Sequence, residues 1–212
     1  MKASCILFDL DGTLLNTNDL VLESLKYTIK THLGTEVEDC KLYRYFGRPL
    51  VDIMADLDPA RADSLIATYR DYNLSKHDNL TCLFPKVPET LKELKKIGVV
   101  TGVVTSKTRK LAVKGLTLFE IDDMFDICIA YEDTDRHKPE PDPVLKALST
   151  LGLDPDKESV IMVGDSPYDI LCANSAGVTS AAVQWSVHPR EVLAAATPDI
   201  WLKDFPALLG HL

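Results

Sequence analysis

The chain has 212 residues, of which 46% are hydrophobic and 26% charged, and its formal net charge is −9 because 32 acidic residues outnumber 23 basic ones. This composition excludes a disordered chain, a collagen-like chain and a coiled-coil rod. The negative charge would repel a phosphate backbone, so we expect no nucleic-acid partner. The length fits one sizeable domain, or one domain with a smaller domain inserted in it.

The sequence shows no signal for a membrane or for secretion. It has no run of 18 or more apolar residues, so we expect no membrane partner. The first apolar run stops at Asp9, which leaves it too short for a secretory signal. The five cysteines are Cys5, Cys40, Cys82, Cys128 and Cys172. Their wide spacing indicates reduced thiols, and we predict a cytoplasmic protein.

Short apolar runs recur along the chain and are typical of strands buried on both faces of a parallel sheet. They lie at residues 5–8, 99–104, 127–130, 160–163 and 180–183. Helical faces between them are formed by Val87, Leu91, Leu94 and Ile97, and by Val144, Leu145, Leu148 and Leu151. Pro88 marks the start of the first helix, and Gly152 marks the end of the second. This alternation predicts an α/β fold with a doubly wound parallel sheet.

The segment 16–79 interrupts the alternation because it contains no convincing buried strand. A first helix is indicated by the spacing of Leu22, Leu25 and Ile29. Its N-terminus is predicted to be capped by Thr17 or Asn18. A second helix is predicted over residues 59–75. We therefore expect an α/β core from residues 1–15 and 80–212, with a small all-helical cap domain, residues 16–79, inserted after the first strand.

The strongest motif is Phe-Asp-Leu-Asp-Gly-Thr-Leu at residues 8–14, directly after the first predicted strand. Asp9 and Asp11 stand two residues apart, so both can face one site at the strand end, where open α/β sheets bind ligands. Gly12 permits a sharp turn there. Two neighbouring carboxylates repel each other, and their hard oxygens suit Mg²⁺. The alternative, a plain turn rich in Asp and Gly, requires an accidental match of four specified residues.

A second acidic motif follows the predicted strand 160–163. Asp165 lies at the end of that strand, and Asp169 follows about one helical turn later, so both can reach the same cation. The alternative is an ordinary helix cap.

Two further segments fit an anion. Thr105 and Ser106 follow a predicted strand, where a hydroxyl and the N–H groups that open a helix can hold a phosphate. Lys138 stands before a proline in a loop, where it can neutralise phosphate charge. Taken alone, a helix cap explains the first segment better than phosphate binding does, and a solvated loop lysine explains the second better.

Together, these four segments resemble the motifs of the haloacid dehalogenase superfamily of phosphatases, in the same order and over essentially the whole chain. The resemblance implies a Rossmann-like hydrolase core, with Asp9 as nucleophile and Asp11 as general acid/base. It implies that Thr105 binds phosphate, that Lys138 stabilises charge, and that the helical insert closes over the site.

The resemblance and the motifs together also imply the ligands. We expect Mg²⁺ to be held by Asp9, by the backbone carbonyl of Asp11, by Asp165 and by Asp169. The equatorial phosphate oxygens are expected to be held by Thr105, the Ser106 N–H group and Lys138.

Within this superfamily the chain looks most like phosphoglycolate phosphatases and bacterial pyrophosphatases of X type. The opening residues 8–18 and the late residues 182–185, with Pro198 and Asp199, carry the likeness to the pyrophosphatases. β-Phosphoglucomutases have a histidine near the position of Val21, which argues against a mutase. Dehalogenases proper have no Asp at the position of Asp11, which favours phosphate chemistry.

We therefore expect a Mg²⁺-dependent phosphatase that hydrolyses a small phosphorylated metabolite, such as phosphoglycolate, or pyrophosphate, through an aspartyl-phosphate. The alternatives are a phosphomutase and a catalytically inactive phosphate-binding module. The sequence is compatible with a monomer or a homodimer.

A few other residues carry weaker expectations. Arg48, in the predicted cap segment 45–49, is a candidate contact for a second anionic group of the substrate, and His137 is a weaker candidate for the site. His77 is expected in the hinge of the cap, and Trp185 is expected to pack under the last helix.

Overall fold

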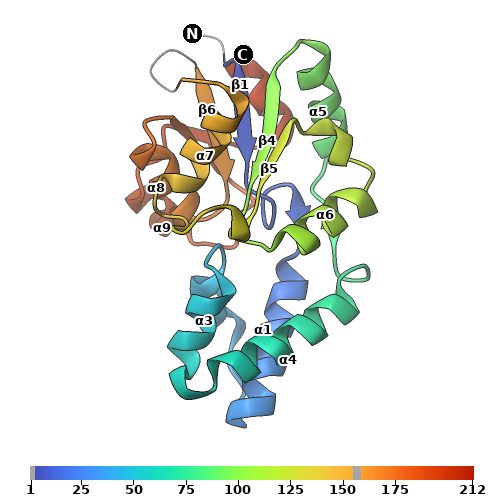
Figure 1. Ribbon diagram of the computed structural model, residues 1–212, viewed down its shortest axis with the longest axis vertical. Helices are drawn as coiled ribbons and strands as arrows, with labels where there is room; N and C mark the ends of the chain where they lie inside the picture. Colours follow the sequence, from blue (N-terminus) through green and yellow to red (C-terminus); the bar gives the residue numbers. More distant parts are fainter. Residues whose placement is uncertain (1–2, 155–158) are drawn as a thin grey trace.

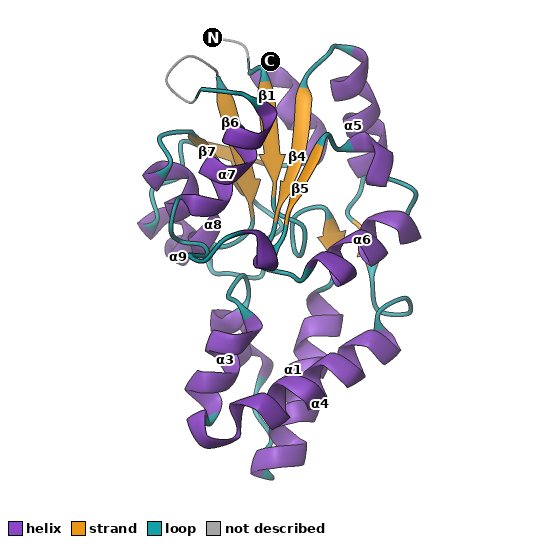
Figure 2. Cartoon of the chain, in the orientation of Figure 1, coloured by secondary structure: helices purple, strands orange, loops and turns teal. Residues whose placement is uncertain are grey.

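The computed structural model describes residues 3–154 and 159–212, which form a larger α/β part and a smaller helical part (Figure 1). The carboxyl ends of the strands point toward the helical part (Figure 2). We call residues 16–79, which contain this helical part, the cap. A site at the strand ends is therefore enclosed between the sheet and the cap.

Within the described residues, the main sheet has six parallel strands in the order β5-β4-β1-β6-β7-β8. Their bounds are β1 Cys5–Phe8, β4 Val100–Val104, β5 Ile127–Ile129, β6 Val160–Gly164, β7 Thr179–Val183 and β8 Ile200–Leu202. The doubly wound parallel sheet is confirmed, and the five predicted strands are present with ends that differ by at most one residue. β8 was not predicted, because its apolar run is only three residues long and stands between Asp199 and Lys203.

Helices cover both faces of the sheet, and β1 in its centre feeds both cores. Ile6 and Phe8 face one core, Cys5 and Leu7 face the other, and all four are fully buried. One face carries α5 Val87–Lys96, α6 Arg109–Leu118 and η5 Phe205–His211. The other face carries α7 Asp142–Leu151 and α8 Pro167–Ser175, with α9 Arg190–Ala195 beside α8. Two single turns, η3 Asp122–Met124 and η4 Tyr131–Asp133, flank β5.

Two residues that the helical pattern assigned to buried faces are exposed. Ile97 is 56% exposed, because α5 ends at Lys96 and Ile97 only caps it. Leu145 is 41% exposed, because α7 buries Val144 and Leu148 instead. Gly152 ends α7 in the left-handed conformation, as predicted.

The cap has its own apolar core. It contains α1 Asn18–Leu33, α2 Asp39–Leu42, η1 Tyr43–Tyr45, α3 Leu50–Leu57, η2 Pro59–Arg61 and α4 Ala62–Lys76. The fully buried Leu25, Met54 and Leu65, from α1, α3 and α4, lie at its centre. No helix in the described part of the chain combines the length and apolarity needed to cross a bilayer.

Two very short strands, which were not predicted, join the cap to the core. β2 Leu15–Asn16 and β3 Cys82–Leu83 pair antiparallel, so the chain enters and leaves the cap side by side. Two residues carry no readable period in a sequence. The pairing holds the two connections of the cap together at one edge of the site.

The central strand sets a test of the fold. We expect Leu7→Ala to lower the free energy of unfolding by about 2–5 kcal/mol, because it leaves a cavity in a fully buried site. The control Leu145→Ala truncates the same side chain at an exposed position and is expected to change it by less than about 0.5 kcal/mol. Urea denaturation measures both. Equal effects would contradict the buried register of β1.

Candidate active site

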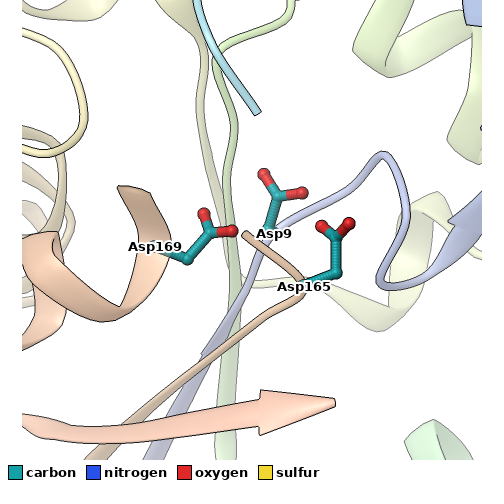
Figure 3. A group of neighbouring side chains, drawn as sticks. All are labelled: Asp9, Asp165 and Asp169. Carbon is teal, nitrogen blue, oxygen red and sulfur yellow. The ribbon is translucent and has the colours of Figure 1, made fainter. Parts of the chain in front are cut away.

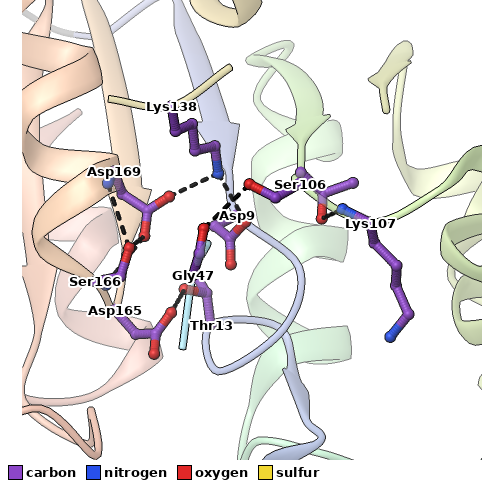
Figure 4. A network of polar contacts seen from close by, with 10 residues as sticks. Asp9, Thr13, Gly47, Ser106, Lys107, Lys138, Asp165, Ser166 and Asp169 are labelled. Atoms are coloured by element: carbon purple, nitrogen blue, oxygen red, sulfur yellow. Dashed lines mark hydrogen bonds and ion pairs between the residues drawn. The ribbon is translucent and has the colours of Figure 1, made fainter. Parts of the chain in front are cut away.

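Neighbouring strand ends bring the polar side chains of the sequence motifs to one edge of the sheet (Figure 4). Asp9 follows β1, Thr105 follows β4 and Asp165 follows β6, and these three strands are adjacent. Lys138 reaches the same place from the loop between η4 and α7. All four residues are at most 5% exposed. The sheet thus assembles a buried polar cluster from segments that are far apart in the sequence.

Three buried carboxylates converge in this cluster (Figure 3). One oxygen each from Asp9, Asp165 and Asp169 lies within 4.8 Å of the others. Burial, opposed by Lys138 but reinforced by Asp169 and Asp11, raises the pKa of Asp9 to about 7. Burial and the neighbouring carboxylates also raise the pKa of Asp165 well above its usual range. Both shifts show that this buried cluster disfavours the ionised form of these carboxylates.

Lys138 supplies the positive charge that is present. Its Nζ donates to Asp9 Oδ1 at 2.7 Å and to Asp169 Oδ1 at 2.6 Å. Burial disfavours the ammonium, but the two carboxylates outweigh it and raise the pKa of Lys138 above its usual value. The ion pairs fix the positions of both aspartates.

Asp169 has a second role at the N-terminus of α8. Its Oδ2 accepts hydrogen bonds from the Ser166 N–H at 3.0 Å and the Ser166 hydroxyl at 2.6 Å. The Ser166 hydroxyl in turn caps the Asp169 N–H. The helix-cap alternative is therefore realised together with the carboxylate cluster, because this capping box leaves Oδ1 of Asp169 for Lys138.

The Asp11 carboxylate is bonded to the start of the cap and to the turn after β4. Its Oδ1 accepts from the Thr17 hydroxyl at 2.7 Å and from Lys107 Nζ at 2.6 Å. Thr17 occupies the N-cap position of α1, but its hydroxyl makes no capping bond, so the predicted side-chain cap is wrong. Gly12 has φ +86°, and a Cβ there would collide with the Asp165 carboxylate, which explains the glycine.

Lys107 was missed in the sequence. Its side chain is only 8% exposed and forms an ion pair with Asp11. Its N–H donates to the Thr105 hydroxyl at 3.1 Å, which shapes the turn after β4. A lysine two residues beyond a strand-end threonine carries no distinctive pattern, so only the fold reveals this contact.

A cap loop covers the cluster. The Ser106 hydroxyl donates to the Gly47 carbonyl at 3.1 Å, which joins the core to the cap (Figure 4). Gly47 has φ +82°, and a Cβ there would lie 2.5 Å from Ser166 Oγ. Only a glycine therefore lets the loop approach Ser166 this closely.

Arg48 and His137 differ in their surroundings. Arg48 lines the cavity described below but forms an ion pair with Asp56 at 2.7 Å. His137 stacks on Tyr131 at 4.0 Å between ring centroids, and Tyr131 rather than His137 lines the cavity.

Three further residues, His77, His188 and Trp185, pack within the fold. His77 is fully buried directly after α4, and its ring contacts Asp78 at 2.8 Å. His188, which carried no prediction, is also buried, and burial lowers its pKa. Trp185 packs against Phe205 at the start of η5, as predicted for a residue under the last helix.

A cavity of about 120 Å³ separates the cap from the strand ends. Asp9, Asp11 and Thr105 line it on the core side. Its lining includes three cationic side chains, those of Arg48, Arg70 and Lys107. Typical pockets for drug-sized ligands measure about 300–1,000 Å³, so this space suits a small anionic ligand.

Known proteins of similar sequence and structure share this architecture. A family model described as haloacid dehalogenase-like hydrolase matches residues 6–183. The "Putative pyrophosphatase PpaX" of Caldanaerobacter subterraneus subsp. tengcongensis is 48% identical over 209 residues, which cover 99% of this chain and 94% of that relative. The "Pyrophosphatase PpaX" of Halalkalibacterium halodurans is 39% identical, with coverages of 99% and 96%. The solved structure of a "predicted phosphoglycolate phosphatase" from Haemophilus somnus has a TM-score of 0.84 at 27% identity, with coverages of 99% and 98%.

The docking of the cap loop can be tested at Gly47. Gly47→Ala and Gly34→Ala both place alanine at a positive φ, which is expected to cost about 1–2 kcal/mol of unfolding free energy. Only the first adds a collision, because no atom lies within 4 Å of a Cβ at Gly34. We expect Gly47→Ala alone to speed hydrogen exchange in residues 45–49. Unchanged exchange there would show that the loop docks without this close approach.

Proposed function

Because the chain belongs to the haloacid dehalogenase-like hydrolases, we propose that it is a Mg²⁺-dependent pyrophosphatase that works through an aspartyl-phosphate on Asp9. The broader statement, that it is a phosphatase of this family, rests on its relatives and on the solved structure. The carboxylate cluster held by Lys138 below a small cavity with cationic walls carries the proposal. Relatives with 48% and 39% identity support pyrophosphate as the substrate.

The residues present fit a magnesium ion. Three buried carboxylates converge while one ammonium group offsets them, and burial, with a smaller contribution from the neighbouring carboxylates, raises the pKa of Asp9. A hard divalent cation would stabilise the ionised carboxylates there. Asp9, Asp165 and Asp169 would hold the ion together with the backbone carbonyl of Asp11. When bound, Mg²⁺ would supply positive charge next to the transferring phosphoryl group.

The chain's own residues can account for the phosphoryl transfer. Asp9 attacks phosphorus and forms an acyl-phosphate bond while the bond from phosphorus to the leaving oxygen breaks. Asp11, on the cap side of Asp9, gives a proton to that oxygen. It then takes a proton from the water that attacks the phospho-enzyme, which releases phosphate and restores Asp9.

Other groups hold the substrate. Thr105, the Ser106 N–H group and Lys138 neutralise the equatorial phosphate oxygens. Arg48 remains a proposed contact for a second anionic group, although it must share its charge with Asp56. The cap, residues 16–79, acts as a lid over the core of residues 1–15 and 80–212, and it excludes water while substrate is bound. We also propose that the enzyme works in the cytoplasm.

A second candidate substrate is phosphoglycolate, which the name of the solved structure from Haemophilus somnus favours. Phosphoglycolate and pyrophosphate both present an anionic group on the leaving side of the phosphoryl group. The cationic side chains of the cavity suit either one. Direct comparison of the two substrates decides between them.

Turnover tests the proposed reaction. Purified protein with Mg²⁺ is expected to hydrolyse pyrophosphate faster than phosphoglycolate, sugar phosphates or an aryl phosphate, and a chelator is expected to abolish the phosphate release. Asp9→Asn removes the nucleophile and is expected to lower kcat by about a thousandfold or more. Asp123→Asn makes the same chemical change on the exposed η3 and is expected to leave kcat unchanged. Wild-type turnover by Asp9→Asn would disprove the nucleophile assignment.

Stability tests the metal site independently. Because the folded-state pKa of Asp9 is about 7, against 3.8 for an ordinary Asp, the metal-free fold binds a proton that the unfolded chain loses. This contribution to stability is full below about pH 4 and is lost as the pH rises toward about 7. Since Mg²⁺ binds the ionised carboxylate, we expect it to raise the melting temperature more at about pH 8 than at about pH 6.

The same melting experiment is repeated with a variant that lacks one carboxylate of the cluster. Asp165→Asn removes one of the three converging carboxylates and is expected to abolish most of the shift that Mg²⁺ produces. A shift of equal size at both pH values, or in the variant, would contradict the site.

A further inference from the structure

One of the cationic side chains that line the cavity has no partner among the described residues. Among the three cationic side chains of the lining, Arg48 is paired with Asp56 and Lys107 is paired with Asp11. Arg70 also lines the cavity, but its side chain has no hydrogen bond, ion pair or ring contact with any residue in 3–154 or 159–212. Its charge is therefore free to meet a ligand.

The other arginines of the chain all have partners. The chain has seven arginines, and the structure describes all of them. The six besides Arg70 are Arg44 on the Tyr45 hydroxyl, Arg48 on Asp56, Arg61 on Asp58, Arg109 on Asp133, Arg136 on Asp142 and Arg190 over the Trp201 ring. A guanidinium is weakly hydrated and has a fixed fork of donors that suits phosphate and carboxylate. An unpaired one on the wall of an anion-binding cavity is therefore a candidate ligand contact.

The position of Arg70 on α4 places it on the leaving-group side. Its neighbours Tyr69 and Asn73, also on α4, line the same cavity. Burial and the charge of Asp11 raise the pKa of Tyr69, so this part of α4 lies within electrostatic reach of Asp11. Asp11 is the residue that we assign to the proton of the leaving oxygen. Asp11 and this stretch of α4 line the same cavity, so a leaving group that takes its proton from Asp11 lies within reach of α4.

Asn73 fixes this part of α4 relative to α1. It is 3% exposed, and its side-chain amide donates to Ser24 Oγ at 3.2 Å. A buried hydrogen bond one turn away gives Arg70 a firm base on the helix although its own side chain is exposed. The guanidinium can thus move to a ligand while its backbone stays in place.

We propose that Arg70 determines substrate specificity by binding the anionic group on the leaving side of the phosphoryl group, the distal phosphate of pyrophosphate or the carboxylate of a small phosphorylated acid. This inference rests on the proposed function, since it presumes phosphoryl transfer at Asp9. It assigns to α4 a recognition role that the sequence motifs do not indicate. A small anion in a cavity of about 120 Å³ can contact both Asp11 and the cap.

Three variants test this role with pyrophosphate, phosphoglycolate and an aryl phosphate, whose leaving group carries no second anion. Arg70→Ala is expected to raise KM for the preferred anionic substrate about tenfold or more, because a charge-assisted contact is lost. KM for the aryl phosphate is expected to change less than twofold. Arg70→Lys keeps the charge and is expected to recover part of the loss. Lys76→Ala removes a charge from α4 outside the cavity lining and is expected to match the wild type.

Calorimetric titration of pyrophosphate and phosphoglycolate into Asp9→Asn, with and without Arg70→Ala, measures binding without turnover. Loss of affinity for the anionic compound in the double variant supports the role of Arg70. Unchanged KM and affinity would overturn it, as would an equal loss with the aryl phosphate, which would indicate a role in cap closure.

The two proposals fail in different ways. If the wild type hydrolyses the aryl phosphate and phosphoglycolate but not pyrophosphate, the pyrophosphatase assignment fails, and Arg70 is judged on phosphoglycolate alone. If pyrophosphate is hydrolysed equally well by wild type and Arg70→Ala, the Arg70 assignment fails and the pyrophosphatase assignment stands.

Discussion

The buried ammonium of Lys138 holds the site together, because it is the positive charge set among three converging carboxylates. It joins Asp9 at the end of β1 to Asp169 at the start of α8, and so ties the central strand to the helix of the last motif. One ammonium does not balance three carboxylates, and burial together with this imbalance raises the pKa values of Asp9 and Asp165. The same imbalance is what would draw in a divalent cation and a phosphate bound to it.

The cap contacts the core next to this cluster of charged side chains. The Asp11 carboxylate accepts hydrogen bonds from Thr17 at the start of the cap and from Lys107 in the turn after β4. Gly47 lets the cap loop approach Ser106 and Ser166, so the cavity closes to about 120 Å³. In the proposed function the core supplies the chemistry, and the small cavity with its cationic side chains is what would select the substrate. This division explains how one set of motifs can serve different phosphorylated compounds.

The accuracy of the sequence predictions followed the strength of the local pattern. The runs that became β1, β4, β5, β6 and β7 were located to within one residue, because strands buried on both faces are continuously apolar. The strands β2, β3 and β8 were missed because their apolar runs are shorter than the four-residue run that revealed β5. Ile97 and Leu145 were assigned to buried faces wrongly, because a helical stripe does not show where the covering layer ends. Thr17 was expected as a cap, but its hydroxyl found a stronger acceptor in Asp11.

The sequence by itself determined the α/β fold class, and it singled out Asp9, Asp11, Thr105, Lys138, Asp165 and Asp169. It could do so because five of them follow apolar runs or stand near helix starts, and Lys138 precedes a proline in a loop, which are local features of the chain. Only the tertiary structure decided which side chains meet: that Lys138 lies between Asp9 and Asp169, that Lys107 holds Asp11, and that Arg70 faces the cavity without a partner. These contacts span tens of residues in the sequence. They depend on how strands, helices and cap pack, and no local pattern encodes that.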